Sequence, residues 1–220
     1  QAAISSTDVD AYGDLYQWGR FSDGHQCRTS NTTATLSSVD QPAHGDFILA
    51  PNSPYDWRSP QNDNLWQGVN GINNPCPSGY RIPTEAELEA ERLSWSANTS
   101  VGAFASPLKL PMAGYRFSSN GSLYSVGTSG YYWSSTVSGA DARRLNFSSS
   151  NADRIRICKD GQALDAAQDR QATDATGIKA APDRASAKSK GGQAGLYALT
   201  DMRPVSTSLS GERRTTATWP

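Results

Sequence analysis

Alternation of apolar and polar residues is clearest in one short segment in the second half of the chain. There Leu145 and Phe147 alternate with Arg144, Asn146 and Ser148. Because successive side chains of a strand point to opposite faces, an extended backbone here buries Leu145 and Phe147 and turns the three polar residues the other way. The pattern predicts a strand with one core face and one polar face that is free to vary.

This segment is the last of five that have the length and composition of short strands. Turns rich in Gly, Asn and Ser separate them. Such a succession of short strands and turns predicts an antiparallel meander. Its members are residues 108–110, 114–117, 122–125, 131–136 and 143–148.

The clearest local signal is a helix start at Thr84. Its hydroxyl can cap the helix while the Glu87 side chain reaches back to the Thr84 amide, which is the capping-box arrangement. We expect a helix over residues 85–95. We expect its buried face to carry Ala86, Ala90 and Leu93.

Long stretches without periodicity precede this helix. Residues 1–11 are small and polar and are expected to be a lead-in, with order beginning near Leu15. Residues 51–77 combine several prolines with Trp57 and Trp66. This mixture cannot sustain a helix, but it can pack its rings into a long ordered loop.

Four sequence blocks, in this order, resemble the Fibrobacter succinogenes major paralogous domain. The match extends over roughly two thirds of the chain, which makes it specific. The blocks are GDLYQWGR (13–20), NPCPSGYRIPT (74–84), LKLPMAGYR (108–116) and GYYWSST (130–136).

The resemblance implies an α+β fold of the C-type-lectin-like kind, with a helix, a short-stranded antiparallel meander and long ordered loops. This fold is related to formylglycine-generating-enzyme-type domains and to the variable proteins of diversity-generating retroelements. What it implies for function is ligand or receptor binding, outside the cell, on the cell surface or on a phage particle. We expect the domain to span residues 12–158.

Residues 159–220 differ in composition from the rest of the chain. Their aromatic residues are Tyr197 and Trp219 only, and residues 159–195 are mostly Ala, Asp, Gln, Lys and Gly. Too little apolar surface is present to offset the entropy of ordering, so we expect a polar tail or insertion. The terminal strand that family members carry has two candidates here, residues 156–160 and, as a returning strand, residues 196–205.

Charge and hydropathy exclude two classes of partner. A net charge of −1 and a pI near 6.1 give no general attraction to nucleic acid or to an anionic membrane. No apolar run approaches the ~20 residues needed to span a bilayer, so no membrane insertion is expected. The chain begins at Gln1 without Met, so nothing about export follows from its start.

The three cysteines, Cys27, Cys76 and Cys158, are too far apart for a zinc-binding Cys-x-x-Cys pair. One would stay unpaired if a disulfide forms. Cys27 with Cys76 is the first candidate pair and Cys76 with Cys158 the second. The alternative, that all three are reduced and buried, stays open because spacing does not fix redox state.

The resemblance places the variable ligand-contacting positions between the GYYWSST block and the terminal strand. Arg offers charge-assisted hydrogen bonds, while Asn and Ser offer adaptable ones on a rigid surface. Tyr131 and Tyr132 point to opposite faces if extended, so that one of them can line the site, whereas Trp133 is expected in the core. The candidate ligand-binding residues are Ser138, Asp141, Arg143, Arg144, Asn146, Ser148, Asn151 and Arg154.

No catalytic residue, metal or cofactor is expected. Ser134 and Ser135 lie in no Gly-x-Ser-x-Gly elbow and no phosphate-binding glycine loop is present. His25 and His44, the only histidines, have no carboxylate or cysteine at the spacing of a metal site. The expected function is a non-enzymatic binding module for an unknown protein or glycan, of open oligomeric state. The alternatives are a formylglycine-generating-enzyme-like catalytic domain and a purely structural module of a fibre or surface layer.

Overall fold

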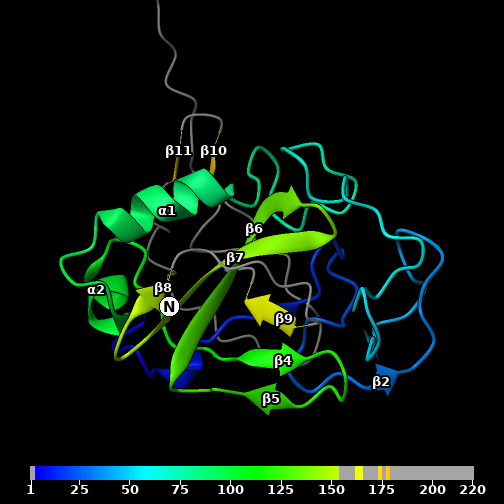
Figure 1. Cartoon of the computed structure of the whole chain (residues 1–220), viewed down its shortest axis with the longest axis horizontal. Helices are drawn as coiled ribbons and strands as arrows, with labels where there is room; N and C mark the ends of the chain where they lie inside the picture. Colours follow the sequence, from blue (N-terminus) through cyan, green and yellow to red (C-terminus); the bar gives the residue numbers. More distant parts are fainter. Residues whose placement is uncertain (1–2, 154–161, 166–172, 175–176, 179–220) are drawn as a thin grey trace, which may run out of the picture. The chain divides into compact units, whose positions relative to one another are not determined.

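The computed structural model describes residues 3–153 together with three short strands further along, at 162–165, 173–174 and 177–178. All of them belong to the first of two compact units of the chain, residues 1–186. Within these described residues the fold is α+β, with two short α-helices and mainly antiparallel sheets, as Figure 1 shows. The predicted α+β class is therefore confirmed.

One seven-stranded sheet organises this unit. Its hairpins are antiparallel, because only short turns join their strands. The order across the sheet is β5 (Leu123–Tyr124), β4 (Tyr115–Phe117), β9 (Gln162–Asp165), β6 (Ser129–Ser138), β7 (Asp141–Ser148) and β8 (Ala152–Asp153), and β1 (Leu15–Tyr16) pairs with β9 off this path.

The predicted meander is wrong in its centre. Strand β9 lies between β4 and β6, antiparallel to the first and parallel to the second, so the β4–β5 and β6–β7 hairpins are not neighbours in one continuous meander. Residues 108–110 form no strand either. Leu108 and Leu110 are buried in a loop that packs into the core.

The end of the domain also differs from the prediction. Strand β9 begins beyond residue 158, so a domain ending there would omit a strand that belongs to its sheet. The two segments proposed for the terminal strand, residues 156–160 and 196–205, lie outside the described residues. Further on, β10 (Thr173–Asp174) and β11 (Gly177–Ile178) pair as a separate antiparallel hairpin.

Helix α1 (Glu85–Leu93) begins with the predicted capping box. The Thr84 hydroxyl accepts from the Glu87 amide, and the Glu87 carboxylate accepts from the Thr84 amide at 2.7 Å. Arg81 donates two further hydrogen bonds to this carboxylate, at 2.7 and 2.8 Å. Mainly for this reason the pKa of Glu87 is lowered to about 2.

The buried stripe predicted for α1 is wrong. Ala86, Ala90 and Leu93 are exposed, whereas Leu88 is the buried residue of the helix. Leu88 packs against Phe147 and its neighbours, so the sheet, rather than the apolar content of the helix, decides which side is covered. A second helix, α2 (Ser100–Ala105), was not predicted and also contacts β7.

The loops before α1 are ordered, as predicted, and are built around buried rings. Trp57 and Trp66 are both buried. Strands β2 (Thr32–Thr33) and β3 (Phe47–Ile48) form a short parallel pair among these loops.

The segment predicted as a lead-in, residues 1–11, has local structure and buried residues where the structure describes it. It contains a 3-10 turn, η1 (Val9–Ala11), and Ala3 and Ala11 are buried. The Ser6 carbonyl also accepts a 2.7 Å hydrogen bond from the Met112 amide, which joins this segment to the loop before β4.

The predicted Cys27–Cys76 disulfide is wrong. Cys27 is an exposed free thiol in the turn that follows Gly24, and Cys76 is a free thiol packed against the aromatic cluster around Trp66. Burial raises the pKa of Cys76 to about 12, so this thiol is protonated and unreactive at neutral pH. The alternative partner, Cys158, lies outside the described residues.

Candidate functional site

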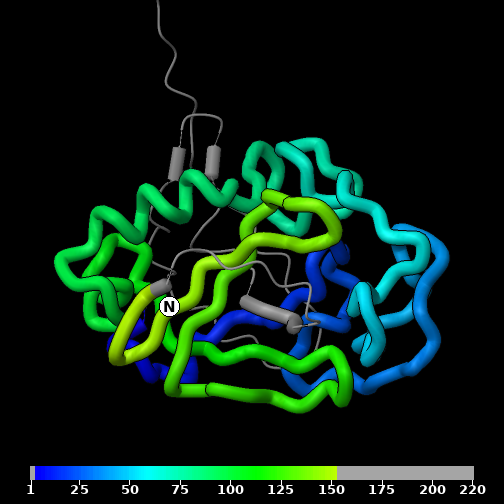
Figure 2. The backbone as a smooth tube through the Cα atoms, viewed as in Figure 1, coloured from blue at the N-terminus to red at the C-terminus, as the bar shows by residue number. Residues whose placement is uncertain are grey.

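The β6–β7 hairpin separates two environments. Its register places Tyr131 opposite Asn146 and Trp133 opposite Arg144, and directly opposite residues share one face of a sheet. Tyr132, Leu145 and Phe147 are then on the other face. Figure 2 traces this hairpin after the β4–β5 hairpin along the chain.

The face with Leu145 and Phe147 is closed, as predicted. Both side chains are buried, and Phe147 stacks on Tyr132 at 5.8 Å and meets Trp95 edge-on at 5.5 Å. The Tyr132 hydroxyl donates to the Pro111 carbonyl at 2.5 Å. Of the two adjacent tyrosines, Tyr132 is therefore the core residue and Tyr131 the one available to a site.

The opposite face is closed over only part of its area. Trp133 is buried as predicted and its indole donates to the Tyr16 carbonyl at 2.9 Å. Trp18 and Trp66 pack in the same cluster, and the Trp18 indole donates to the Ser134 carbonyl. This layer covers the half of the face around Trp133.

The other half carries a row of partly exposed aromatic side chains, which we call the aromatic ledge. It consists of Tyr131 from β6, Tyr115 and Phe117 from β4, and Tyr124 from β5. Centroid distances along the row are 5.1 Å for Tyr131 and Tyr115, 5.6 Å for Tyr115 and Tyr124, and 5.8 Å for Tyr124 and Phe117. Tyr124 is 41% exposed.

The ledge was missed from the sequence, although a signal for it was present. Tyr115 and Phe117 alternate with Arg116 in the order Tyr-Arg-Phe, which places the two rings on one face of β4. Arg116 is buried on the opposite side, where it lies 4.3 Å from the Phe47 ring centroid. The contacts among the rings on β4, β5 and β6 depend on the order of these strands in the sheet, which the sequence alone does not reveal.

Gly114 fixes how closely β5 approaches the start of β4. Its φ of +71° lies in the left-handed region, and a Cβ there would meet the Tyr124 carbonyl oxygen at 2.4 Å. Only glycine fits both requirements without a backbone shift. The backbone under Tyr115 and Tyr124 is therefore held tightly.

Arg144 is on the ledge side of β7 but differs from the prediction in its exposure. It is 7% exposed, and its guanidinium carbon lies 5.1 Å from the Tyr131 ring centroid. This cation–π contact covers the charge that alternation alone would leave to solvent. Arg144 therefore supports Tyr131 from the side.

Asn146 is also on the ledge side of β7. Within the part of the chain that the structure describes, its Oδ1 atom is buried and accepts no hydrogen bond. A buried carbonyl oxygen without a donor costs free energy. Asn146 lies directly opposite Tyr131, at the end of the ledge.

The remaining predicted residues do not join this surface as a group. Ser138 and Asp141 face one another at the far end of the hairpin, and Arg143 lies near Glu85 with 3.6 Å between Nε and Oε2. Ser148 donates to the Asn151 Oδ1 at 2.9 Å in the turn after β7. Arg154 lies outside the described residues. The structure thus brings Arg144, Asn146 and Ser148 together on one side of β7.

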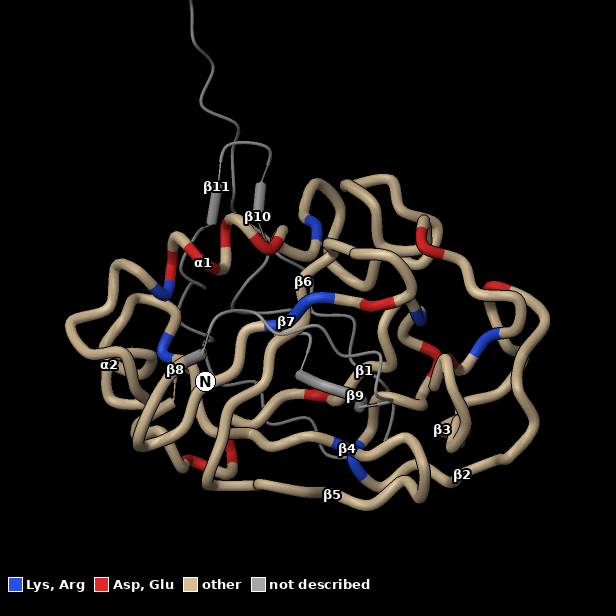
Figure 3. The backbone as a smooth tube through the Cα atoms, in the orientation of Figure 1, with Lys and Arg blue, Asp and Glu red and all other residues tan. Residues whose placement is uncertain are grey.

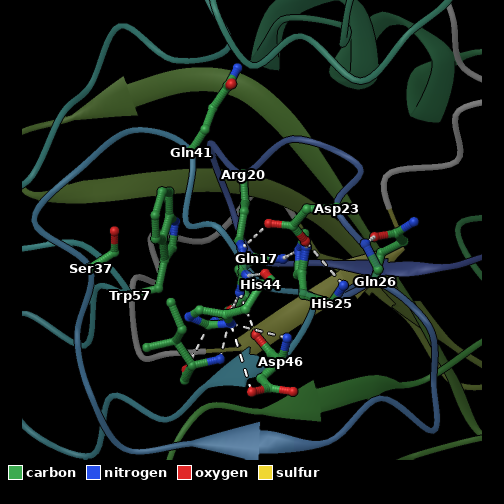
Figure 4. Close-up of polar contacts among 12 residues, drawn as sticks. Gln17, Arg20, Asp23, His25, Gln26, Ser37, Gln41, His44, Asp46 and Trp57 are labelled. Carbon is green, nitrogen blue, oxygen red and sulfur yellow. Dashed lines mark hydrogen bonds and ion pairs between the residues drawn. The ribbon is translucent and has the colours of Figure 1, made fainter.

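A second polar cluster, shown in Figure 4, surrounds the buried His25. His25 Nδ1 lies 2.6 Å from Asp23 Oδ1, and His25 Nε2 accepts the Gln17 amide at 3.1 Å. Because Nε2 is an acceptor, the ring is neutral and Nδ1–H donates to the carboxylate. Both ring nitrogens are occupied, so the cluster is structural rather than a general base, and Asp23 is a partner that the sequence analysis overlooked.

This cluster predicts a pH-dependent stability. Burial lowers the pKa of His25 from 6.5 to about 4, so the unfolded chain takes up the proton more readily between these values. The free energy of unfolding should keep this whole contribution above pH ~6.5 and should fall by about 3 kcal/mol as the pH drops to ~4. Urea unfolding at several pH values measures it, with His25→Gln as the comparison. If the His25→Gln variant loses as much unfolding free energy between pH ~6.5 and ~4 as the wild type, the loss belongs to groups other than His25.

Two further features were sought among the described residues. They contain no group of three or more His, Cys, Asp or Glu placed to hold a metal ion, and no helix among them is long and apolar enough to cross a membrane. In Figure 3 the basic residues of this part of the chain are scattered among acidic ones.

Comparisons with known proteins add no relative. No protein-family model, no curated protein and no solved structure matches the chain.

Proposed function

We propose that this chain is a non-enzymatic ligand- or receptor-binding module that binds through the aromatic ledge together with Asn146 and Ser148. One observation carries the proposal. Four partly exposed rings touch in a continuous row on the half of a sheet face that the core leaves open. Contiguous exposed apolar surface of this kind marks interaction sites, and tyrosine is enriched in them.

The rigidity of the ledge supports the same function. Its rings stand on paired strands, Gly114 fixes the approach of β5, and Arg144 supports Tyr131. A surface that is already ordered loses little conformational entropy when a ligand binds. In this proposal the paired strands hold the rings in place, and the exposed side chains contact the ligand.

The sequence resemblance supports the location and the setting. The variable positions that it implies include Asn146 and Ser148, which lie beside the ledge. We therefore propose a C-type-lectin-like module that is displayed outside the cell, on the cell surface or on a phage particle, with diversification by a retroelement as the source of its polar positions. The partner class that this leaves is a protein or a glycan.

Catalysis has less support. In the described part of the chain His25 is buried with both nitrogens bonded, and Cys27 and Cys76 are separate free thiols. A formylglycine-generating-enzyme-like reaction relies on closely placed cysteines. The alternative of a purely structural module predicts instead that substitutions of ledge residues do not change the affinity for any ligand.

Asn146→Ala should separate binding from stability. Removing a buried oxygen that lacks a donor should leave the free energy of unfolding unchanged or raise it by up to ~1 kcal/mol. The affinity for a protein or glycan captured from a surface screen should fall by about tenfold, the loss of one good hydrogen bond. Calorimetric melting and titration measure the two quantities, and Asn52→Ala, in the exposed loop after β3, is the matched control. Unchanged affinity in Asn146→Ala would remove Asn146 from the site.

A further inference from the structure

We propose that Asn70 is a site of spontaneous covalent modification, at which the Gly71 amide nitrogen attacks the Asn70 side-chain amide and converts this residue to aspartate and isoaspartate. The chain contains two Asn-Gly pairs, Asn70–Gly71 and Asn120–Gly121. Glycine in the second position leaves the attacking nitrogen unhindered, because glycine has no Cβ. The two pairs differ in the hydrogen bonds that hold them. The modification does not depend on the proposed binding function.

The reaction is balanced with water as its co-reactant. The Gly71 nitrogen forms a bond to Asn70 Cγ and loses its proton, the bond from Cγ to Nδ2 breaks, and ammonia leaves. Water then opens the five-membered imide. Opening at Cγ gives aspartate, and opening at the main-chain carbonyl carbon gives isoaspartate. Because the attacking nitrogen must give up its proton, we expect the rate to rise with pH above neutrality.

Asn70 has the freedom that this attack needs. Its side chain is exposed, so water reaches it, and it makes no hydrogen bond to any residue that the structure describes. The Gly71 amide donates to the Gly68 carbonyl at 3.4 Å. This is longer than the usual separation of about 2.9 Å, so the bond is weak. Little therefore has to be broken before the nitrogen meets Cγ.

Asn120 is exposed as well, but its neighbours hold it in place. Its Oδ1 accepts from the Ser122 amide at 2.9 Å, and its Nδ2 donates to the Tyr124 hydroxyl at 3.1 Å. The Gly121 amide donates to the Phe117 carbonyl at 2.7 Å. A tenfold difference in rate corresponds to about 1.4 kcal/mol, which one or two such hydrogen bonds supply. We therefore expect this second pair to react at least about tenfold more slowly than the first.

The modification falls in a loop that braces its neighbours. Asn73, in the same loop, is fully buried, and its Nδ2 donates to the carbonyl oxygens of Gly19 and Asp40 at 2.9 and 2.6 Å. Gly71 is closely packed, because a Cβ there would meet the Leu65 carbonyl oxygen at 2.9 Å. Isoaspartate lengthens the main chain by one methylene group at the modified residue. It therefore displaces this packed segment and weakens the brace, whereas aspartate adds only a charge.

The test incubates the full chain at mildly alkaline pH and follows both pairs by peptide mass mapping, with fragmentation that distinguishes aspartate from isoaspartate. We expect modified Asn70 to accumulate at least about tenfold faster than modified Asn120. In concentrated urea, where neither pair is held, the two rates should lie within about threefold of each other. Asn70→Gln keeps the amide but lengthens the side chain, so the five-membered imide cannot form and the modification should be lost.

Ion exchange then separates the modified chain, which carries one more negative charge. The isoaspartate form should unfold at a lower urea concentration than the unmodified chain, whereas Asn70→Asp, which has the charge without the added methylene, should match the wild type. Two results would overturn the site: equal or faster reaction at Asn120 in the folded chain, or an unmodified Asn70 after an incubation that modifies the urea-unfolded chain. An isoaspartate form as stable as the unmodified chain would refute the weakening of the brace.

Discussion

Replacing Arg20 by methionine should lower the free energy of unfolding by about 3 to 5 kcal/mol, because it breaks a buried ion pair on one side only. Arg20 is fully buried, and its Nε donates to Asp23 at 2.8 Å. Its two terminal nitrogens also satisfy Gln17 Oε1 and the carbonyl oxygens of His44 and Asp46. Methionine fills similar volume but leaves all four acceptors without these donors.

Urea unfolding measures the effect, and Arg92→Met is the matched control. Arg92 pairs at 2.8 Å with Glu89, three residues earlier in α1, with side-chain exposures of 12% and 26%, and such a pair within one helix contributes less than about 1 kcal/mol. Equal losses in the two variants would mean that the Arg20 network stabilises the loops no more than a partly exposed ion pair within one helix does.

Replacing Phe147 by alanine should cost about 3 to 5 kcal/mol, the usual range for deleting a buried aromatic ring. Its side chain is 1% exposed and contacts the rings of Tyr132 and Trp95. Phe21→Ala, which deletes a 43% exposed ring, should cost less than about 1 kcal/mol. Thermal and urea unfolding of both variants give the comparison.

Gly130 provides a sharper test of the same packing. A Cβ on Gly130 would lie 2.3 Å from Phe147 Cζ, and this ring is buried in contact with the rings of Tyr132 and Trp95. Gly130→Ala should therefore destabilise the wild-type chain yet be neutral or stabilising in the Phe147→Ala background, where the added methyl enters the cavity. Additive effects in this double-mutant cycle would contradict the close contact.

Local signals were predicted correctly where the interacting groups are close in sequence. The capping box joins Thr84 and Glu87 within one turn, so the helix start follows from four residues. The alternation around Leu145 and Phe147 likewise fixes which face of β7 is buried. The exposure of Arg144 could not be predicted in this way, because its cover is Tyr131 from the neighbouring strand.

The features that could not be predicted depend on pairing between strands that are far apart in the sequence. Strand β9 has the sequence Gln-Ala-Leu-Asp, which has little periodicity, and its place is fixed by pairing with β1, β4 and β6 from distant parts of the chain. The buried side of α1 and the contacts of the aromatic ledge depend on the same assembly. The residues of the ledge were visible in the sequence, but their adjacency was not.

The most direct test of the proposed function is the affinity of the Tyr124→Ala variant for a glycan or receptor protein that the wild-type chain captures. Tyr124 is 41% exposed in the ledge and Phe21 is 43% exposed outside it, so Phe21→Ala removes a ring of similar exposure as the control. Binding through the ledge predicts a loss of about tenfold or more in Tyr124→Ala, with Phe21→Ala within about twofold of wild type. Equal affinity of the two variants would contradict the account.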